Sequence, residues 1–329
     1  MSTSNSFHMT RRRLLQGALA AGAGLAFPQW SRAQQGGGRT LQLGYIGPSR
    51  NLVNPTGWSL ASGGLTREIA ALGYTGVTTH MFLNGPDLNE AFFSGALDVG
   101  IYGDTPSTVA KSRGLDARLV GFDQVGLDAW LLTPRGGGVT SVKDLEGKTV
   151  AVALGSYMHR YVLGLLKEAG ILKTTNVVYM LPRDGAPALE KKSIAAFAAP
   201  IDNGPLLIAK GFPVLDQASW HPGLAGSSLI QVSGPALQRT PGLPAALLRS
   251  RQAAIKEIQA DPEKYYAFHA KASGYPLEVI KASRSISQFP LEAYPADGIK
   301  LLNQVESFLL EQKLIRKPVD IAQWQVQGL

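Results

Sequence analysis

Cysteine is absent from the 329 residues, and histidine occurs only five times. The absence of cysteine excludes disulfides, thiolate metal sites, cysteine nucleophiles and a lipid-modified N-terminal cysteine. No two histidines have the spacing of metal ligands, so we expect no metal site. The sequence also lacks a Gly-x-Ser-x-Gly elbow, an HExxH pair and paired carboxylates in one motif. We therefore assign no catalytic residue and no cofactor.

Charged residues are also scarce, at 17%, beside 45% hydrophobic residues, which is the balance of a globular protein. The net charge is +8, but the first 33 residues hold four arginines and no acidic residue. The rest of the chain has 28 basic and 24 acidic residues. It has no basic run with interleaved aromatic residues, so we expect no nucleic-acid partner.

Residues 1–33 have the pattern of an export signal. A twin-arginine motif at Thr10–Gln16 precedes an apolar stretch at 14–27, and Ser31-Arg32-Ala33 places small residues where a signal peptidase reads them. A membrane anchor would need about 20 apolar residues, and this stretch is shorter. We expect export by the twin-arginine pathway, cleavage near Ala33 and a periplasmic protein.

Beyond this segment, strands alternate with helices, which predicts an α/β fold with mostly parallel sheets flanked by helices. The chain after residue 33 is longer than one hydrophobic core usually holds, so two lobes are expected. The clearest helix begins after Ser156, with an apolar stripe at Val162, Leu165, Leu166 and Ala169. Further helices are predicted at 59–72, 87–94 (with Asp87 as N-cap), 108–113, 244–260, 263–273, 276–283 and 296–314. Strands are predicted at 41–46, 77–82, 97–101, 119–122, 129–133, 150–154, 177–181, 194–198 and 228–232.

Several short motifs, in this order and at these spacings, resemble one protein family. They are Leu43-Gly44-Tyr45 with Asn51-Leu52-Val53, then 95–100 with Gly103-Asp104-Thr105-Pro106, then 141–148 with Gly155-Ser156, then Leu181-Pro182, and finally 313–315 with 317–321. The chain resembles the periplasmic solute-binding proteins of ABC importers, in particular the aliphatic sulfonate, taurine and nitrate group.

The resemblance implies a two-lobed periplasmic-binding-protein (type 2) clamshell. Lobe one would comprise residues 34–122 and 230–329, and lobe two residues 123–229. The protein would be a monomer that binds a small organic anion, such as an aliphatic sulfonate, between the lobes. It would deliver this solute to the permease and ATPase subunits of the importer.

A clamshell binder needs polar groups in loops at the carboxyl ends of strands, where helix N-termini favour an anion. Three loops meet this requirement. One more candidate is an acidic residue near the end of a lobe-two strand, which comes slightly later than the acidic residue of the family pattern. The candidate ligand-binding residues are Ser49, Arg50 and Asn51, then Gly103 and Thr105, then Ser156 and Tyr157, and finally Asp202.

Three neighbouring residues have alternative interpretations. Asp104 is expected to cap a helix more than to contact the ligand. His159 lies beside the apolar stripe, which favours a structural role. Arg160 lies on the other side of that helix, so we expect its side chain to be solvated.

Two other functions stay open. The first is an enzyme built on the same two-lobed fold. Enzymes of this kind that attach a cofactor through cysteine are excluded by composition, and those resembling thiamine-pyrimidine synthases would need a cysteine-rich segment. The second is a periplasmic sensor module that presents the ligand signal to a membrane receptor.

Overall fold

The computed structural model describes residues 38–47, 51–221 and 223–329, and their strands form two five-stranded sheets. The first sheet has the order β2-β1-β3-β10-β4. Here β1 pairs in parallel with β2 and β3, and β10 pairs antiparallel with β3 and β4. The strands are β1 (Arg39–Ile46), β2 (Tyr74–Phe82), β3 (Val99–Gly103), β4 (Ala117–Leu127) and β10 (Gly226–Ser233).

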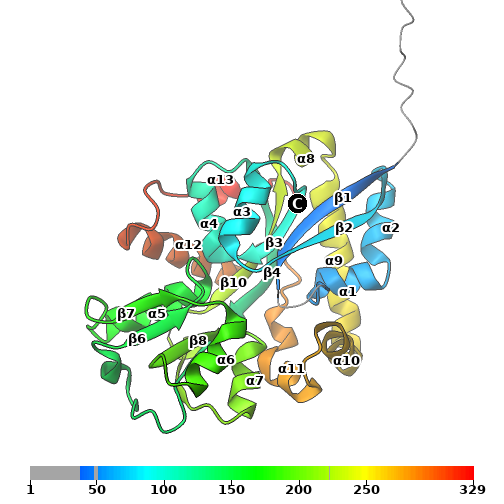
Figure 1. Cartoon of the computed structure of the whole chain (residues 1–329). Helices are drawn as coiled ribbons and strands as arrows, with labels where there is room; N and C mark the ends of the chain where they lie inside the picture. Colours follow the sequence, from blue (N-terminus) through cyan, green and yellow to red (C-terminus); the bar gives the residue numbers. More distant parts are fainter. Residues whose placement is uncertain (1–37, 48–50, 222) are drawn as a thin grey trace, which may run out of the picture. The chain divides into compact units, whose positions relative to one another are not determined.

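The second sheet has the order β7-β6-β8-β5-β9 (Figure 1). Here β6 pairs in parallel with β7 and β8, while β5 pairs antiparallel with β8 and β9. Both sheets therefore hold more antiparallel pairing than the sequence predicts. The strands are β5 (Ala129–Leu132), β6 (Thr149–Val152), β7 (Asn176–Tyr179), β8 (Ala196–Pro200) and β9 (Val214–Gln217).

Helices flank both sheets, and each sheet has its own core. The helices of residues 54–127 are α1 (Pro55–Ala61), α2 (Gly64–Ala70), α3 (Gly85–Phe93) and α4 (Asp104–Ser112). Those of residues 129–225 are η1 (Val142–Leu145), α5 (Tyr157–Glu168), α6 (Pro182–Glu190), α7 (Asn203–Ala209) and η2 (Ala218–Trp220). Those after β10 are α8 (Gly234–Arg239), α9 (Leu243–Ala260), α10 (Pro262–Ser273), α11 (Leu277–Ser283), η3 (Ile286–Gln288), α12 (Ala296–Glu311) and α13 (Ile321–Trp324).

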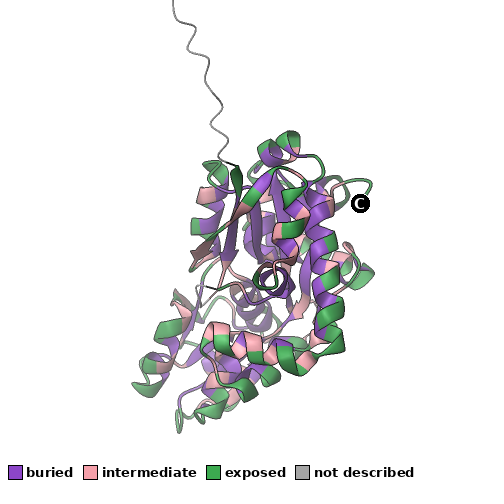
Figure 2. Ribbon diagram, turned by 90° about the vertical axis from the view of Figure 1, so that its right-hand side faces the viewer, coloured by how far each residue is buried: buried purple, intermediate pink, exposed green. Residues whose placement is uncertain are grey.

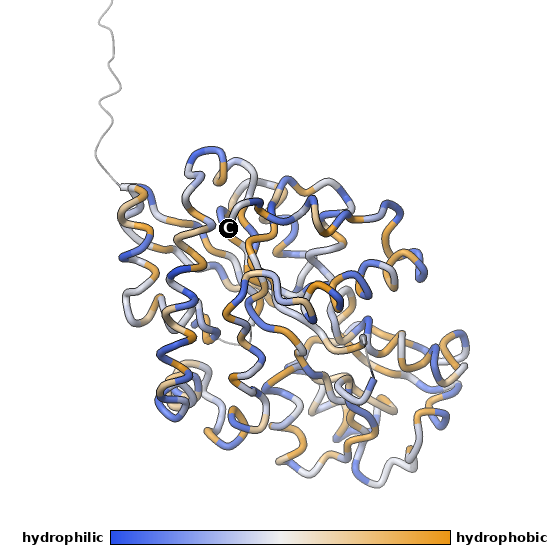
Figure 3. The backbone as a smooth tube through the Cα atoms, turned by 180° about the vertical axis from the view of Figure 1, so that it is seen from behind, coloured by the Kyte–Doolittle hydropathy of each residue, from blue (hydrophilic) through white to orange (hydrophobic). Residues whose placement is uncertain are grey.

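The central strands are buried because helices cover them. Figure 2 colours the strands mostly as buried and the outward sides of the helices as exposed. The residues of β3 and β8 are almost all apolar and buried, which is typical of strands covered on both faces. Hydrophobic and hydrophilic stretches follow one another along the helices (Figure 3), which is typical of helices that cover a sheet with one face.

Many of the predicted elements are confirmed. The stripe residues Val162, Leu165 and Leu166 are buried in the core of the second sheet. The four helices predicted after residue 243 are α9 to α12. The predicted helix at 59–72 is wrong in detail, because Gly63 adopts a left-handed conformation (φ 76°) and separates α1 from α2.

The predicted cap of α3 is also wrong. The N-cap is Asn84, whose side chain accepts a hydrogen bond from the amide of Asp87 at 2.9 Å. Within the described residues, no helix is long and apolar enough to cross a membrane. The export signal expected at residues 1–33 lies outside the described residues.

Candidate functional site

A pocket of about 580 Å³ lies between the two sheets, and residues from both line it. From the first sheet come Ile46, at the end of β1, and Gly103, at the end of β3. From the second come Pro200, at the end of β8, and Ala153, which follows β6. The pocket therefore lies at the carboxyl ends of strands, where α/β proteins bind ligands.

Four helices of nine or more residues begin at this pocket. Their N-cap residues all line it, namely Asn84 of α3, Gly103 of α4, Ser156 of α5 and Leu181 of α6. The N-terminus of a helix carries partial positive charge and amides that precede the first intrahelical hydrogen bond. Four such ends at one pocket favour a bound anion over a cation.

A buried arginine that the sequence did not single out also lines the pocket. Arg284 follows α11, and its Nε and Nη2 atoms donate to the two carboxylate oxygens of Asp202 at 3.1 and 2.9 Å. Its Nη1 atom donates to Oε1 of Gln124 at 3.2 Å. Burial opposes the charge of Arg284, but Asp202 outweighs burial, so the pKa of Arg284 is raised and it stays protonated.

Asp202 is held in an uncommon geometry. Its backbone has a positive φ of 68°, its side chain is 1% exposed, and Nε2 of His269 lies 3.5 Å from Oδ2. Burial alone would raise the pKa of this carboxyl, but Arg284 and His269 outweigh burial and lower it, so Asp202 is ionised. Because Asp202 follows β8 and Arg284 follows α11, this ion pair joins the second sheet to a helix of the last third of the chain.

A second buried pair, Asp123 with Arg251, lies at the same pocket, because Asp123 and its partner Asn54 both line it. Oδ2 of Asp123 accepts from Nδ2 of Asn54 at 2.8 Å, and Nε of Arg251 lies 3.9 Å from Oδ1. Burial raises the pKa of Asp123, although Arg251 opposes this, and burial lowers the pKa of Arg251 to about 10. Arg251 also donates to the backbone carbonyl of Asp123 at 2.9 Å.

The pocket brings together most of the candidate ligand-binding residues. Asn51, Gly103, Ser156, Tyr157 and Asp202 all line it. Thr105 is buried and is not among the lining residues. Ser49 and Arg50 lie outside the described residues.

The hydroxyl groups of Ser156 and Tyr157 already have partners in the protein. Oγ of Ser156 accepts from the amide of His159 at 3.2 Å, which makes Ser156 the N-cap of α5. The hydroxyl of Tyr157 donates to the carbonyl of Asp128 at 3.0 Å and accepts from the amide of Ile201 at 3.2 Å. Both residues therefore stabilise the pocket wall.

Arg160 corrects one expectation. Its side chain is 1% exposed rather than solvated, and Nη2 lies 3.5 Å from Oδ2 of Asp104. Nη1 and Nη2 donate to the carbonyls of Gly223 and Ala225, both at 2.7 Å, and Nε donates to Oγ1 of Thr105 at 3.3 Å. Arg160 thus ties α5 to α4 and to the segment that leads into β10.

Asp104 has a structural role, but it is not the helix cap that the sequence predicts, because the N-cap of α4 is Gly103 and Asp104 is the first residue of the helix. Its carboxylate accepts from the amide of Ser227 at 2.7 Å and from Oγ1 of Thr105 at 2.9 Å. Burial raises the pKa of Asp104, and Arg160 opposes that shift. The Thr105 hydroxyl belongs to this buried network, which explains why it does not line the pocket.

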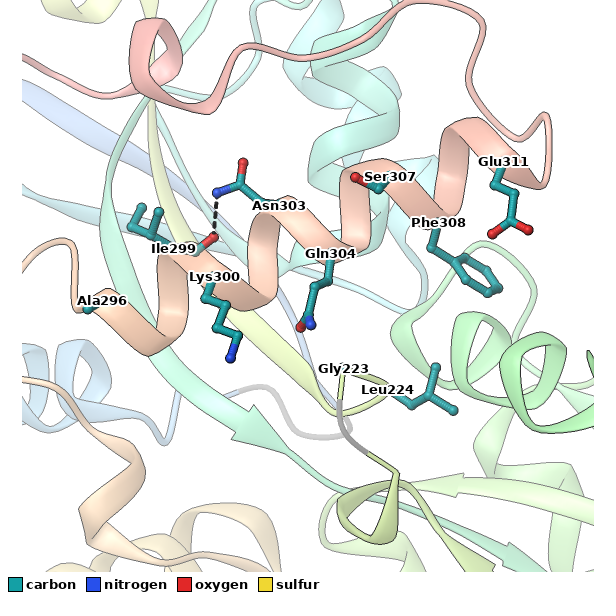
Figure 4. A pocket seen from close by; sticks show the side chains of 10 residues that line it. All are labelled: Gly223, Leu224, Ala296, Ile299, Lys300, Asn303, Gln304, Ser307, Phe308 and Glu311. Atoms are coloured by element: carbon teal, nitrogen blue, oxygen red, sulfur yellow. Dashed lines mark hydrogen bonds between the residues drawn. The ribbon is translucent and has the colours of Figure 1, made fainter. Parts of the chain in front are cut away.

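A second hollow, of about 780 Å³, lies along α12 and is a weaker candidate. Figure 4 shows Lys300, Gln304 and Phe308 extending from α12 toward Gly223 and Leu224. The polar side chains that line it are exposed, namely Lys300, Asn303, Gln304, Ser307 and Glu311. Among the described residues, no group of three or more His, Asp or Glu side chains is arranged to hold a metal ion.

Comparisons with known proteins agree with this architecture. The profile of a family described as NMT1/THI5 like matches residues 83–265. An Escherichia coli K12 protein named "Putative aliphatic sulfonates-binding protein" is 29% identical over 259 residues, which are 74% of this chain and 78% of that protein. A Bacillus subtilis protein of the same name is 29% identical over 119 residues, 36% of each chain.

Solved structures show the same fold at lower sequence identity. The periplasmic aliphatic sulphonate binding protein SsuA of E. coli has a TM-score of 0.70 and 24% identity, with 88% of this chain and 98% of SsuA covered. SsuA of Xanthomonas axonopodis pv. citri, bound to MOPS, has a TM-score of 0.70 and 22% identity, with 87% and 98% covered. The desulfurization enzyme DSZB has a TM-score of 0.71 and 16% identity, with 88% and 97% covered. The two-lobed periplasmic-binding-protein fold predicted from the sequence is thus confirmed.

Proposed function

Because the chain belongs to the NMT1/THI5-like family, we propose that it is the periplasmic substrate-binding component of an ABC importer. It binds a small organic anion, such as an aliphatic sulfonate, between its two lobes. The observation that carries this proposal is the pocket between the sheets. Four helices begin there, and the protonated Arg284 lines it. The E. coli relative named for aliphatic sulfonates supports the ligand class.

Ligand binding shifts the population of a two-state clamshell. A ligand in this pocket touches walls from both sheets, so it makes its full set of contacts only when the lobes are closed. The closed form then docks on the permease subunits, and the ATPase subunits supply the energy. In this proposal lobe one comprises residues 34–122 and 230–329, and lobe two comprises residues 123–229.

Export and assembly complete the proposal. The twin-arginine pattern of residues 1–33 supports transport to the periplasm and cleavage near Ala33. The protein acts as a monomer and as a binder rather than an enzyme, because the polar groups described at the pocket stabilise its walls. The likeness to DSZB is the reason to test the enzymatic alternative. A binder releases its ligand unaltered, whereas an enzyme converts it.

The decisive experiment identifies what the mature protein carries. The chain from residue 34 to 329 is purified from its own periplasm, and native mass spectrometry is used to identify a co-purified small molecule. We expect an organic anion that raises the melting temperature in a saturable way and is recovered unchanged. An altered product would indicate an enzyme. Unchanged uptake with lost regulation after gene deletion would indicate a sensor.

A further inference from the structure

The segment that leads from η2 into β10 is fastened along α5. Near the end of the helix, Oε2 of Glu168 lies 2.8 Å from Nδ1 of His221. One turn into the helix, Arg160 binds two carbonyl groups of the segment. At the start of the helix, the ring of Tyr157 packs so closely on Gly226 that a Cβ atom there would lie 2.5 Å from Cγ of the ring. The segment therefore belongs to lobe two, and the second crossing between the lobes lies at the start of β10.

Beside this crossing, α5 touches lobe one through a buried contact. Nη2 of Arg160 lies 3.5 Å from Oδ2 of Asp104 in α4, and the two side chains are 1% and 0% exposed. The same carboxylate accepts from the amide of Ser227 in β10. Separating a buried ion pair leaves an uncompensated buried charge on each side. The lobes therefore rotate about this contact rather than part at it.

The pocket and the hollow along α12 lie on opposite sides of the buried contact. α5 begins at the pocket, which its N-cap Ser156 lines. Arg160 follows one turn later, and Lys167 lies about 10 Å farther along the helix axis. There the hollow is lined by α12 and by two residues of the fastened segment (Figure 4). A rotation that narrows the pocket therefore widens this hollow.

An ion pair joins the two lobes beside the hollow. Nζ of Lys167 in α5 binds Oε1 of Glu311 in α12, and the side chains are 46% and 55% exposed. Widening the hollow lengthens the distance between these two atoms, so the ion pair is lost when the pocket closes. An exposed ion pair changes an equilibrium constant by at most about fivefold. A ligand can therefore close the lobes against it.

We propose that Lys167 and Glu311 control ligand affinity from outside the pocket, because their ion pair stabilises the open clamshell. The apparent affinity of a ligand falls with the fraction of protein that is closed and competent to bind. Two residues that do not touch the ligand thus weaken its binding. This inference rests on the proposed function, but it does not depend on the chemistry of the ligand.

Charge reversals test the ion pair. Lys167→Glu and Glu311→Lys each replace an attraction by a repulsion. We expect each variant to bind hexane-1-sulfonate about two- to fivefold more tightly than the wild type in calorimetry. The double variant restores a pair of opposite charges, so its affinity should return to that of the wild type.

The two reversals also separate the ion pair from long-range attraction of the ligand. They change the net charge in opposite directions, so long-range attraction would move their affinities for an anion in opposite directions. Loss of the ion pair moves both affinities in the same direction. Arg249→Glu is the matched control, because its partner Glu68 lies in the same lobe and the two side chains are 57% and 34% exposed. This control should show no gain in affinity.

The opening of the lobes is also measured without a ligand. Because the chain has no cysteine, Lys173→Cys and Arg316→Cys provide two unique positions for spin labels. Both side chains are exposed, and one follows α5 whereas the other follows α12. We expect the distance between the labels to be longer in the Lys167→Glu protein than in the wild type. In the double variant the distance should return to that of the wild type.

The outcomes separate the two proposals. Opposite changes in affinity for the two reversals, or a double variant that does not return to the wild type, would overturn the inference and leave the binding function intact. If hexane-1-sulfonate does not bind and no small molecule co-purifies, the proposed function itself fails. The label distances then still decide the inference, since equal distances in the wild type and in both reversals would contradict it.

Discussion

Replacing Arg160 by methionine should strongly destabilise the protein. The substitution keeps an unbranched apolar side chain of similar length but removes the guanidinium. Asp104, 0% exposed, then loses its buried cation, and the carbonyls of Gly223 and Ala225 each lose a hydrogen bond of 2.7 Å. Thr105 loses a weaker bond of 3.3 Å.

The magnitude follows from the burial of the pair. Removing one partner of a buried ion pair costs about 3–5 kcal/mol, because the other charge stays buried without compensation. Asp104 keeps its hydrogen bonds from Ser227 and Thr105, so we expect a cost at the lower end of this range. We expect Arg160→Met to lower the free energy of unfolding by about 3 kcal/mol.

Urea unfolding followed by circular dichroism measures this loss. The double variant with Asp104→Asn should be less destabilised than the sum of the single variants, because it no longer buries an unpaired charge. Arg249→Met is the control, since its ion pair with Glu68 is exposed and exposed pairs contribute at most about 1 kcal/mol. A loss below about 1 kcal/mol for Arg160→Met would refute the reasoning and favour a solvated arginine.

Three further variants probe single contacts. Ser156→Ala removes the cap of α5 and should cost about 1 kcal/mol in urea unfolding; unchanged stability with weaker ligand binding would make Ser156 a ligand contact instead. Gly204→Ala places a Cβ atom 2.2 Å from Cε3 of Trp130 and should cost about 1–3 kcal/mol, whereas a neutral effect would mean that the ring moves freely. Burial lowers the pKa of His221, but Asp216 outweighs burial and the net shift is upward. Protonated His221 therefore stabilises the folded protein fully below the pKa of the unfolded chain, about 6.5. This stabilisation is lost as the pH rises through the higher pKa of His221 in the folded protein. Unfolding measured on both sides of that range should show this loss in the wild type and not in His221→Gln.

Elements with a regular apolar pattern could be predicted from the sequence. The helix with Val162, Leu165 and Leu166 has one continuous apolar face, and that face is buried against the second sheet. Helices α9, α10 and α12 are long enough for the same pattern to be clear. Strands β3 and β8 are short apolar runs between polar turns, and both were expected within a few residues of their observed bounds.

Two helices of the second lobe were missed because their composition disfavours helix. α6 contains Gly185 and Pro187, and α7 begins at Asn203-Gly204-Pro205. Glycine and proline lower helix propensity. Packing explains the two glycines, because a Cβ atom at Gly185 would lie 2.4 Å from the ring of Phe197. These tertiary contacts outweigh local propensity, and a single sequence does not reveal them.

Arg284 shows why the charge of the candidate site escaped prediction. Its partner Asp202 lies 82 residues away, and no motif links the two positions. The resemblance to the solute-binding family predicts Asp202, slightly after the acidic position of the family pattern, yet an isolated ionised carboxylate would repel an anionic ligand. The bidentate pair resolves this conflict, because Arg284 neutralises the carboxylate and the carboxylate fixes the orientation of the guanidinium. In the structure, the acidic residue predicted as a ligand contact is the group that orients Arg284 at the pocket.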